Sequence, residues 1–173
     1  MKTMDPQQAM NMLQTVATAV AKESQPEKIF SIIDQCLNKM IGHRLFTILI
    51  LDLDSDSCQR CYSSQPDLYP IGGKKKINRS DDFFHELVIK KKPRLCYNYE
   101  DIKVAFYDHE LIYSLGCESA INYPIQVEGK IIGSLNILHK SEWYSADDFN
   151  ILKLYSIFLI PSLLKLIKVN LMA

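Results

Sequence analysis

The stretch that decides the fold runs from Gly116 to Lys140 and reads Gly-Cys-Glu-Ser-Ala-Ile-Asn-Tyr-Pro-Ile-Gln-Val-Glu-Gly-Lys-Ile-Ile-Gly-Ser-Leu-Asn-Ile-Leu-His-Lys. β-branched and aliphatic residues dominate both halves of this stretch. Between the halves, Glu128-Gly129 places a glycine where a tight hairpin needs a positive φ angle. The stretch therefore predicts two antiparallel strands, around which the other elements are arranged.

Two helices are predicted on the N-terminal side of this hairpin. Asp5 before Pro6 supplies an N-cap acceptor and then a ring already set to helical φ. Ser24-Gln25-Pro26-Glu27 starts a second helix, which ends at Gly42. We therefore divide the chain into an N-terminal helix, residues 1–23, and a domain formed by residues 24–173. We expect the N-terminal helix to pack on the C-terminal helix or on a dimer partner.

The remaining pattern predicts an antiparallel sheet of about five or six strands, because consecutive strands are joined by short turns. Terminal helices can pack on one face of this sheet, and short helices and loops on the other. The expected fold class is an α+β three-layer sandwich. The expected strands are 45–53, 58–64 and 94–97 with the two arms of the hairpin, and the expected helices after Gly42 are 80–90, two short helices within 98–115, and one that begins after Ser145.

Composition narrows the class of protein. A chain of 173 residues fits one domain, and its 20 Lys plus Arg equal its 20 Asp plus Glu. This balance argues against nucleic-acid binding, which needs a basic excess. The longest apolar run, Leu154–Leu164, has about half of the roughly 20 residues that a membrane span needs. We therefore expect a cytoplasmic protein without a membrane span, with its five cysteines reduced.

Three features of the chain resemble a GAF domain: the first domain helix closing on Ile41-Gly42-His43-Arg44-Leu45-Phe46-Thr47, the hairpin, and the last helix opening after Trp143-Tyr144-Ser145. Within the hairpin, Ile121-Asn122-Tyr123-Pro124-Ile125 turns into Ile132-Gly133-Ser134-Leu135-Asn136-Ile137-Leu138. This resemblance covers roughly residues 24 to 168. It implies the fold directly, whereas the family shares no catalytic motif.

The resemblance implies a non-catalytic sensory or regulatory module that binds a small molecule or a protein partner. The family binds its ligands between the sheet and the middle helices, and many members dimerise through their terminal helices. A homodimer is also expected because the last helix is apolar nearly all round, more than one sheet face can cover. With no further domain in the chain, the module would signal to a separate partner. The alternative is a domain without an open pocket that serves only as a dimerisation scaffold. The cofactor is left unassigned.

The candidate ligand site is an aromatic cluster in the middle segment with nearby polar groups. Ligand pockets are mostly apolar with a few convergent polar side chains. The alternative is that these aromatic residues simply fill the space between short helices and sheet, as in ordinary cores. The candidate ligand-binding residues are Tyr97, Tyr99, Asp101, Phe106, Tyr113 and Asn122.

An enzymatic alternative concerns two cysteines. One branch of the family reduces free methionine sulfoxide with cysteines in and near the middle segment, where Cys96 and Cys117 lie. Neither thiol aligns with the motif of that branch, and free cysteines are commonly buried and inert. We therefore expect no catalytic residues, with Cys96 and Cys117 as the alternative.

Other chemical motifs are weak. Cys58-Gln59-Arg60-Cys61 has the spacing of a redox or zinc pair, but on a strand an offset of three points the two thiols to opposite faces. The four histidines are scattered, so no metal site is expected. Gly72-Gly73-Lys74-Lys75-Lys76 lacks the spacing of a phosphate-binding loop and is expected to be a solvated basic loop.

Overall fold

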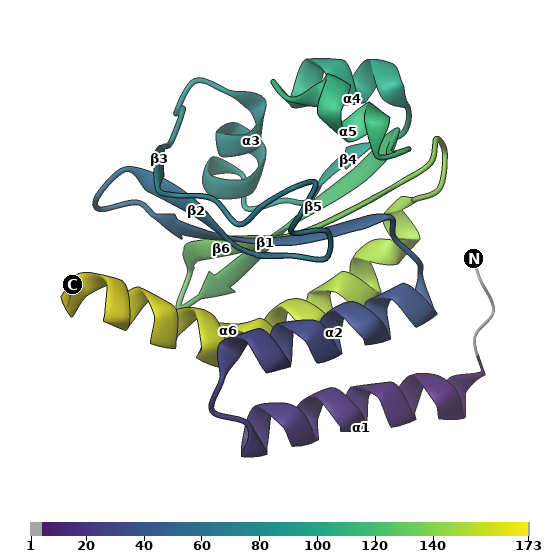
Figure 1. The fold of residues 1–173 in the computed structure, drawn as a ribbon, viewed down its shortest axis with the longest axis vertical. Coiled ribbons are helices and arrows are strands. Elements are labelled where there is room, and N and C mark those ends of the chain that lie inside the picture. Colours follow the sequence, from purple (N-terminus) through teal and green to yellow (C-terminus); the bar gives the residue numbers. More distant parts are fainter. Residues whose placement is uncertain (1–4, 173) are drawn as a thin grey trace.

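The computed structural model describes residues 5–172. Residues 1–4 of the predicted N-terminal segment 1–23 and residue 173 of the predicted domain 24–173 therefore lie outside the described residues. A six-stranded sheet forms the centre, with the order β3-β2-β1-β6-β5-β4 and antiparallel pairing throughout (Figure 1). The strands are β1 Leu45–Asp52, β2 Ser57–Ser63, β3 Lys75–Lys76, β4 Arg94–Cys96, β5 Ser119–Val127 and β6 Lys130–His139.

Helices cover both faces of the sheet, which confirms the predicted α+β sandwich. The lower face in Figure 1 carries α2 (Pro26–Met40) and α6 (Phe149–Met172), which follows the 3-10 turn η2 (Ala146–Asp148). The other face carries the short elements α3 Asp82–Phe84, the π-helical turn η1 His85–Ile89, α4 Tyr99–Ala105 and α5 His109–Ser114.

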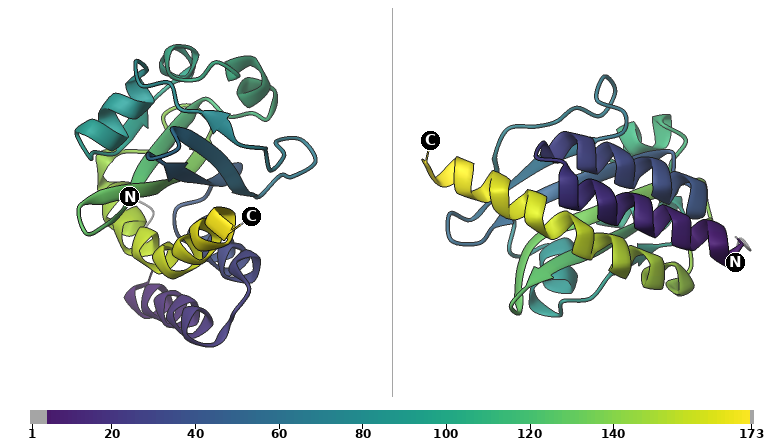
Figure 2. Two further views of the ribbon diagram at one scale, coloured as in Figure 1. Left: turned by 90° about the vertical axis from the view of Figure 1, so that its left-hand side faces the viewer. Right: turned by 90° about the horizontal axis from the view of Figure 1, so that it is seen from below.

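The first helix, α1 (Pro6–Lys22), forms an additional outer layer. It packs on α2 and α6 and lies away from the sheet (Figures 1 and 2). Asp5 caps it as predicted, because its Oδ1 accepts a hydrogen bond of 3.2 Å from the Gln7 amide. The completely buried Val16 joins α1 to the core beneath it.

The second helix begins without the predicted capping box. Its N-cap is Gln25, which makes no side-chain capping bond. The Glu23 carboxylate instead accepts the backbone N–H groups of Ser24 and Gln25, at 2.8 and 3.0 Å. These two N–H groups precede the first helical residue, so the predicted serine cap is absent and no side chain caps α2.

The central hairpin forms as predicted. Its turn residues Glu128 and Gly129 both have positive φ angles, of 48° and 80°, as a two-residue turn between twisted strands requires. Strand β6 lies between β5 and β1, so the hairpin supplies two of the four inner strands.

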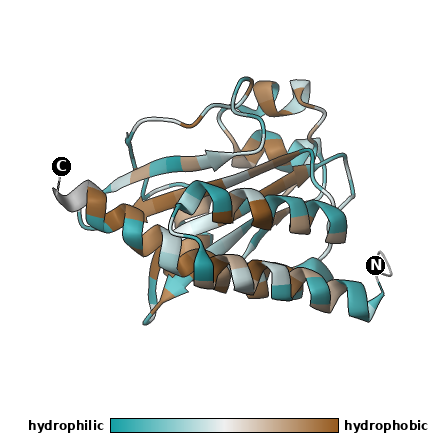
Figure 3. Ribbon diagram, turned by 60° about the horizontal axis from the view of Figure 1, so that its bottom comes forward, coloured by the Kyte–Doolittle hydropathy of each residue, from teal (hydrophilic) through white to brown (hydrophobic). Residues whose placement is uncertain are grey.

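Alternation along the strands divides the interior into a lower and an upper part. Phe46, Ile48 and Ile50 of β1 belong to the main core, which α2 and α6 cover. Leu45 belongs to a separate cluster under α4 and α5. In Figure 3 hydrophilic (teal) and hydrophobic (brown) residues alternate along the helices in front, as expected for helices with one buried face.

The last helix is longer than its apolar sequence run suggested. Among residues 5–172, the segment Ala146–Val169 is the one candidate for a membrane span by length and composition, and 33% of its most apolar window is buried within the domain. A single helix of this kind is weak support for a membrane span, because core helices meet the same criterion.

Candidate functional site

A cavity of about 200 Å³ lies between the upper face of the sheet and the short helices. Strands β1, β2, β4, β5 and β6 supply its floor, and the segments around α3 and between α4 and α5 supply its walls. The cavity is the candidate functional site because polar side chains that are otherwise buried converge on it.

Four polar side chains cross the floor of the cavity in a single hydrogen-bonded row. They are Arg94 of β4, Asn122 of β5, Asn136 of β6 and Thr47 of β1, which lie directly opposite one another in the strand register. Each is less than 9% exposed, and all four line the cavity. We call this row the polar ladder.

Hydrogen bonds in the polar ladder all run in one direction. The Arg94 guanidinium donates to Asn122 Oδ1 through Nε (3.0 Å) and Nη2 (2.8 Å). Asn122 Nδ2 donates to Asn136 Oδ1 at 2.7 Å, and Asn136 Nδ2 donates to Thr47 Oγ1 at 3.2 Å. Because the amides satisfy one another, four polar groups are buried together without orphaned amide atoms.

The charge at the end of the polar ladder forms one long ion pair among the described residues. Its partner is Asp82, whose Oδ2 lies 3.7 Å from Arg94 Nη1 and whose side chain is 57% exposed. The rings of Phe106 and Phe83 face the guanidinium, with centroids at 4.8 and 5.5 Å. Burial lowers the pKa of Arg94, but a guanidinium starts above 12 and stays protonated.

The structure brings two of the six predicted ligand residues to the cavity. Phe106 and Asn122 line it, whereas Tyr97, Tyr99, Asp101 and Tyr113 do not. Tyr99 packs on the Tyr113 ring at 4.5 Å, and its hydroxyl lies 3.1 Å from His109 Nδ1. The Asp101 carboxylate accepts the backbone N–H of Tyr97 at 2.7 Å, so these four residues hold α4 and α5 in place.

Three members of the polar ladder were not predicted from the sequence, namely Thr47, Arg94 and Asn136. Thr47 and Asn136 each interrupt a mostly apolar strand with a polar residue, which is the signal that could have identified them, whereas Arg94 is the first residue of β4. That signal alone does not reveal that the four side chains meet, because their contact depends on the strand order.

Solved structures resemble this architecture over nearly its whole length. The GAF domain of an Acinetobacter phosphoenolpyruvate-protein phosphotransferase matches with a TM-score of 0.71 at 10% identity, over 94% of this chain and 95% of that chain. The GAF domain of a Bacillus halodurans sensor histidine kinase matches with a TM-score of 0.66 at 16% identity, over 83% and 96%. This chain has the GAF domain fold. No protein-family model matches the sequence, and no curated protein matches it.

Another solved structure with this GAF architecture is an enzyme. The free methionine-R-sulfoxide reductase from Neisseria meningitidis matches with a TM-score of 0.66 at 15% identity, over 93% of this chain and 92% of that chain. At this identity the likeness concerns the fold alone, so the thiols of this chain must be considered on their own chemistry.

The two candidate thiols lie outside the cavity. Cys96 and Cys117 are 3% and 0% exposed and belong to the apolar cluster beneath α4 and α5. Burial raises the pKa of Cys96 to about 11 and that of Cys117 to about 12. Both thiols are therefore protonated at neutral pH, the less nucleophilic form.

The Cys58 and Cys61 thiols face opposite sides of the sheet, as expected from their spacing. Cys58 lines the cavity, whereas Cys61 packs against the lower core and its Sγ lies 3.4 Å from the Ile48 carbonyl oxygen. All five cysteines are free. Within residues 5–172 no group of three or more His, Cys, Asp or Glu side chains could hold a metal ion.

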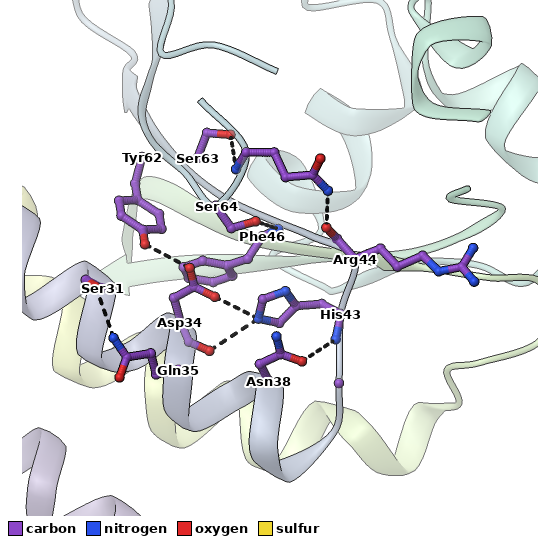
Figure 4. Close-up of polar contacts among 12 residues, drawn as sticks. Ser31, Asp34, Gln35, Asn38, His43, Arg44, Phe46, Tyr62, Ser63 and Ser64 are labelled. Carbon is purple, nitrogen blue, oxygen red and sulfur yellow. Dashed lines mark hydrogen bonds and ion pairs between the residues drawn. The ribbon is translucent and has the colours of Figure 1, made fainter. Parts of the chain in front are cut away.

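A second polar cluster joins α2 to the sheet on the lower face (Figure 4). The Asp34 carboxylate accepts a 2.8 Å hydrogen bond from the Tyr62 hydroxyl and lies 2.9 Å from His43 Nε2. The His43 side chain is 2% exposed, and its backbone N–H donates to Asn38 Oδ1 at 3.3 Å. None of these residues lines the cavity described above, and their contacts join α2 to β2 and to the segment before β1, so we assign the cluster to anchoring α2 on the sheet.

Proposed function

We propose that this GAF domain is a non-catalytic sensory module that binds a small molecule in the cavity above the sheet. The observation that carries this proposal is the polar ladder. Burying an arginine and two amides costs free energy unless the groups are used or fully satisfied. Here the row lies along the floor of a cavity, which is the arrangement typical of a ligand site with a few convergent polar groups.

The comparisons support a sensory role. Structures of similar architecture come from a sensor histidine kinase and from residues 122 to 287 of a methyl-accepting chemotaxis protein. In the mechanism that we propose, the ligand orders the segment 98–116, which forms one wall of the cavity, and thereby changes the packing of the terminal helices.

A homodimer belongs to the same proposal. On the outer side of α6, Leu154, Ile157, Pro161 and Leu164 follow one another at helical spacing and are all exposed. Lys153, Lys165 and Lys168 flank this stripe on the exposed surface. An apolar stripe bordered by lysines is suited to a second copy of the chain or to a separate signalling protein.

A cytoplasmic location is also part of the proposal, because a reducing compartment maintains free thiols such as the five in this chain. The reductase alternative has less support. Cys96 and Cys117 are buried away from the cavity with raised pKa values, whereas a thiol nucleophile needs an exposed, low-pKa setting. The scaffold alternative, a domain that only dimerises, is opposed by the cavity itself.

Native mass spectrometry of the protein purified from its own cells tests the proposal. We expect a dimer that carries the mass of a small molecule. An Ala105→Phe variant serves as the control, because the larger side chain projects from the cavity wall and should release that mass while the dimer persists. A parent protein without retained mass that also shows no thermal shift with any compound of a metabolite library would support the scaffold alternative instead.

The reductase alternative has its own test. The parent protein and a Cys96→Ser/Cys117→Ser variant are assayed for reduction of free methionine sulfoxide. We expect no turnover in either protein. Turnover in the parent that disappears in the variant would replace the sensory proposal with an enzymatic one.

A further inference from the structure

The cavity lining carries one positive charge in excess. Three of its residues are cationic, namely Arg60, Lys75 and Arg94, and two are carboxylates, namely Asp81 and Asp108. The carboxylates already accept hydrogen bonds from neutral groups: Asp81 from the Phe84 backbone N–H and Asp108 from the Tyr69 hydroxyl, both at 2.7 Å. Neither carboxylate makes a close ion pair with a cation of the lining.

Two guanidinium groups of the lining have unused capacity for an anion. Arg94 is held by amide and carbonyl oxygens and by aromatic rings, and its ion pair with the exposed Asp82 is long, at 3.7 Å. Arg60 stacks over the Tyr69 ring at 3.8 Å and donates from Nη1 to the Pro70 carbonyl at 2.7 Å. Its buried Nε–H has no hydrogen-bond partner among the described residues.

An unsatisfied buried donor on a charged group is unfavourable, and a buried cation is normally paired with an anion. An anion in the cavity would satisfy both requirements. A single excess positive charge matches a monoanion better than a dianion, because the two carboxylates of the lining repel a second negative charge. The planar N–H fork of arginine also matches the two oxygens of a carboxylate.

The rest of the lining is suited to an anion whose uncharged part is apolar. Phe83, Phe106, Leu49 and Leu138 contribute apolar surface. The cavity volume of about 200 Å³ has room for roughly seven water molecules at ~30 Å³ each, which is the scale of one six-membered ring with a small substituent.

We infer that the ligand is a small monocarboxylate with an apolar or aromatic body, whose carboxylate is bound by Arg60 and Arg94. This inference rests on the proposed function, since it assumes that the cavity is the ligand site. It adds the chemical class of the ligand and assigns the charge recognition to two named residues.

Isothermal titration calorimetry with benzoate and its neutral isostere benzamide tests this inference, with acetate and inorganic phosphate as further probes. We expect benzoate to bind at least about tenfold more tightly than benzamide, because only benzoate makes charge-assisted hydrogen bonds. Acetate should bind more weakly than benzoate because it lacks the ring. Amide chemical-shift changes in an NMR spectrum should be confined to residues around the cavity.

Arg60→Gln should abolish the preference for benzoate over benzamide. Arg79→Gln is the matched control, because Arg79 is an exposed arginine that pairs with Asp56 outside the cavity. If Arg60→Gln does not fold, Lys75→Gln replaces it, since this exposed residue also contributes positive charge to the lining and should reduce the preference in part.

Equal binding of benzoate and benzamide, tighter binding of phosphate, or no binding of benzoate would each overturn the carboxylate inference. None of these results removes the proposed function by itself, because a small molecule retained in native mass spectrometry would still establish the cavity as a binding site. A parent protein that retains no small molecule in native mass spectrometry would, by contrast, count against the proposed function.

Discussion

At the residue scale, the chemistry of this domain depends on polar side chains that are buried in two different ways. The Asp34–His43–Tyr62 cluster is closed, because the carboxylate receives contacts from both partners and none of the three lines the cavity above the sheet. The polar ladder is open, because its members line a cavity. Closed clusters are expected to contribute stability and open ones to contribute recognition.

The buried cysteines give a prediction on the dependence of stability on pH. Burial raises the pKa of Cys96 to about 11 and of Cys117 to about 12, whereas an unfolded thiol titrates near ~8.5. Between these values the unfolded chain loses protons that the folded chain keeps, so stability falls as pH rises. We expect the free energy of unfolding, measured with urea, to decrease from about pH 8.5 to pH 11.

A Cys96→Ala/Cys117→Ala variant is the control, since its urea midpoint should fall less over the same pH range.

The burial and raised pKa values of Cys96 and Cys117 also predict an order of thiol modification. We expect iodoacetamide to modify Cys58, which is partly exposed, before Cys96 and Cys117 in the native state at pH 8. Rapid modification of either buried thiol in the folded protein would contradict the prediction.

At the element scale, the hairpin is where the backbone packs most tightly. Gly133 of β6 lies opposite Ile50 of β1. A Cβ atom at Gly133 would lie 2.3 Å from the Leu49 carbonyl oxygen and 3.1 Å from a methyl carbon of Leu163 on α6. Because the nearest atom belongs to a strand backbone, it cannot move without disturbing the sheet.

Gly133→Ala is therefore expected to lower the free energy of unfolding by about 1–3 kcal/mol, as overpacked core positions do. The measurement is equilibrium unfolding in urea followed by circular dichroism. Gly72→Ala is the matched control, because a Cβ atom there meets nothing within 4 Å, and its effect should stay within about 0.5 kcal/mol. Equal stability of both variants would mean that β6 and β1 can separate at this point without loss.

At the scale of the whole molecule, α6 connects the sheet to the surface. Its inner side supplies Leu152, Tyr155, Leu159 and Leu163 to the main core. Its outer side leaves Ile157 53% exposed and Leu154 47% exposed. The domain needs only the inner side to fold, so the outer side is available for a second copy.

We expect Ile157→Glu to convert the proposed dimer to a monomer, because it places a charge in the middle of the apolar stripe. Sedimentation velocity at several protein concentrations measures this change. The control is Val104→Glu on α4, an 88% exposed apolar residue on the opposite face, which should leave the dimer intact. A parent protein that is monomeric at all concentrations would show that the stripe serves a different partner.

Much of this fold follows from the sequence because its signals are local. The β-branched and aliphatic runs of the hairpin, the glycine at the 128–129 turn and Asp5 before Pro6 act over a few residues, and each gave the expected element. The start of α2 shows the limit of such signals, since the Ser24 side chain makes no capping bond and Glu23 binds the two N–H groups just before the helix. Neighbouring acceptors compete, and the backbone path decides between them.

The cavity is different, because it depends on contacts between segments that lie far apart in the sequence. Asn136 and Thr47 are separated by 89 residues but lie opposite each other in the β1–β6 register. Tyr97 and Tyr113 have the composition of a ligand site, yet they stand about half exposed beside it, because the path of α4 and α5 turns them away. The sequence by itself determined most of the elements, the order in which they follow and the apolar faces that they bury, but not the short strand β3, which forms where a solvated loop was expected. Only the tertiary structure decided which polar side chains share the cavity, because strand register and helix placement are set by the packing of the whole chain.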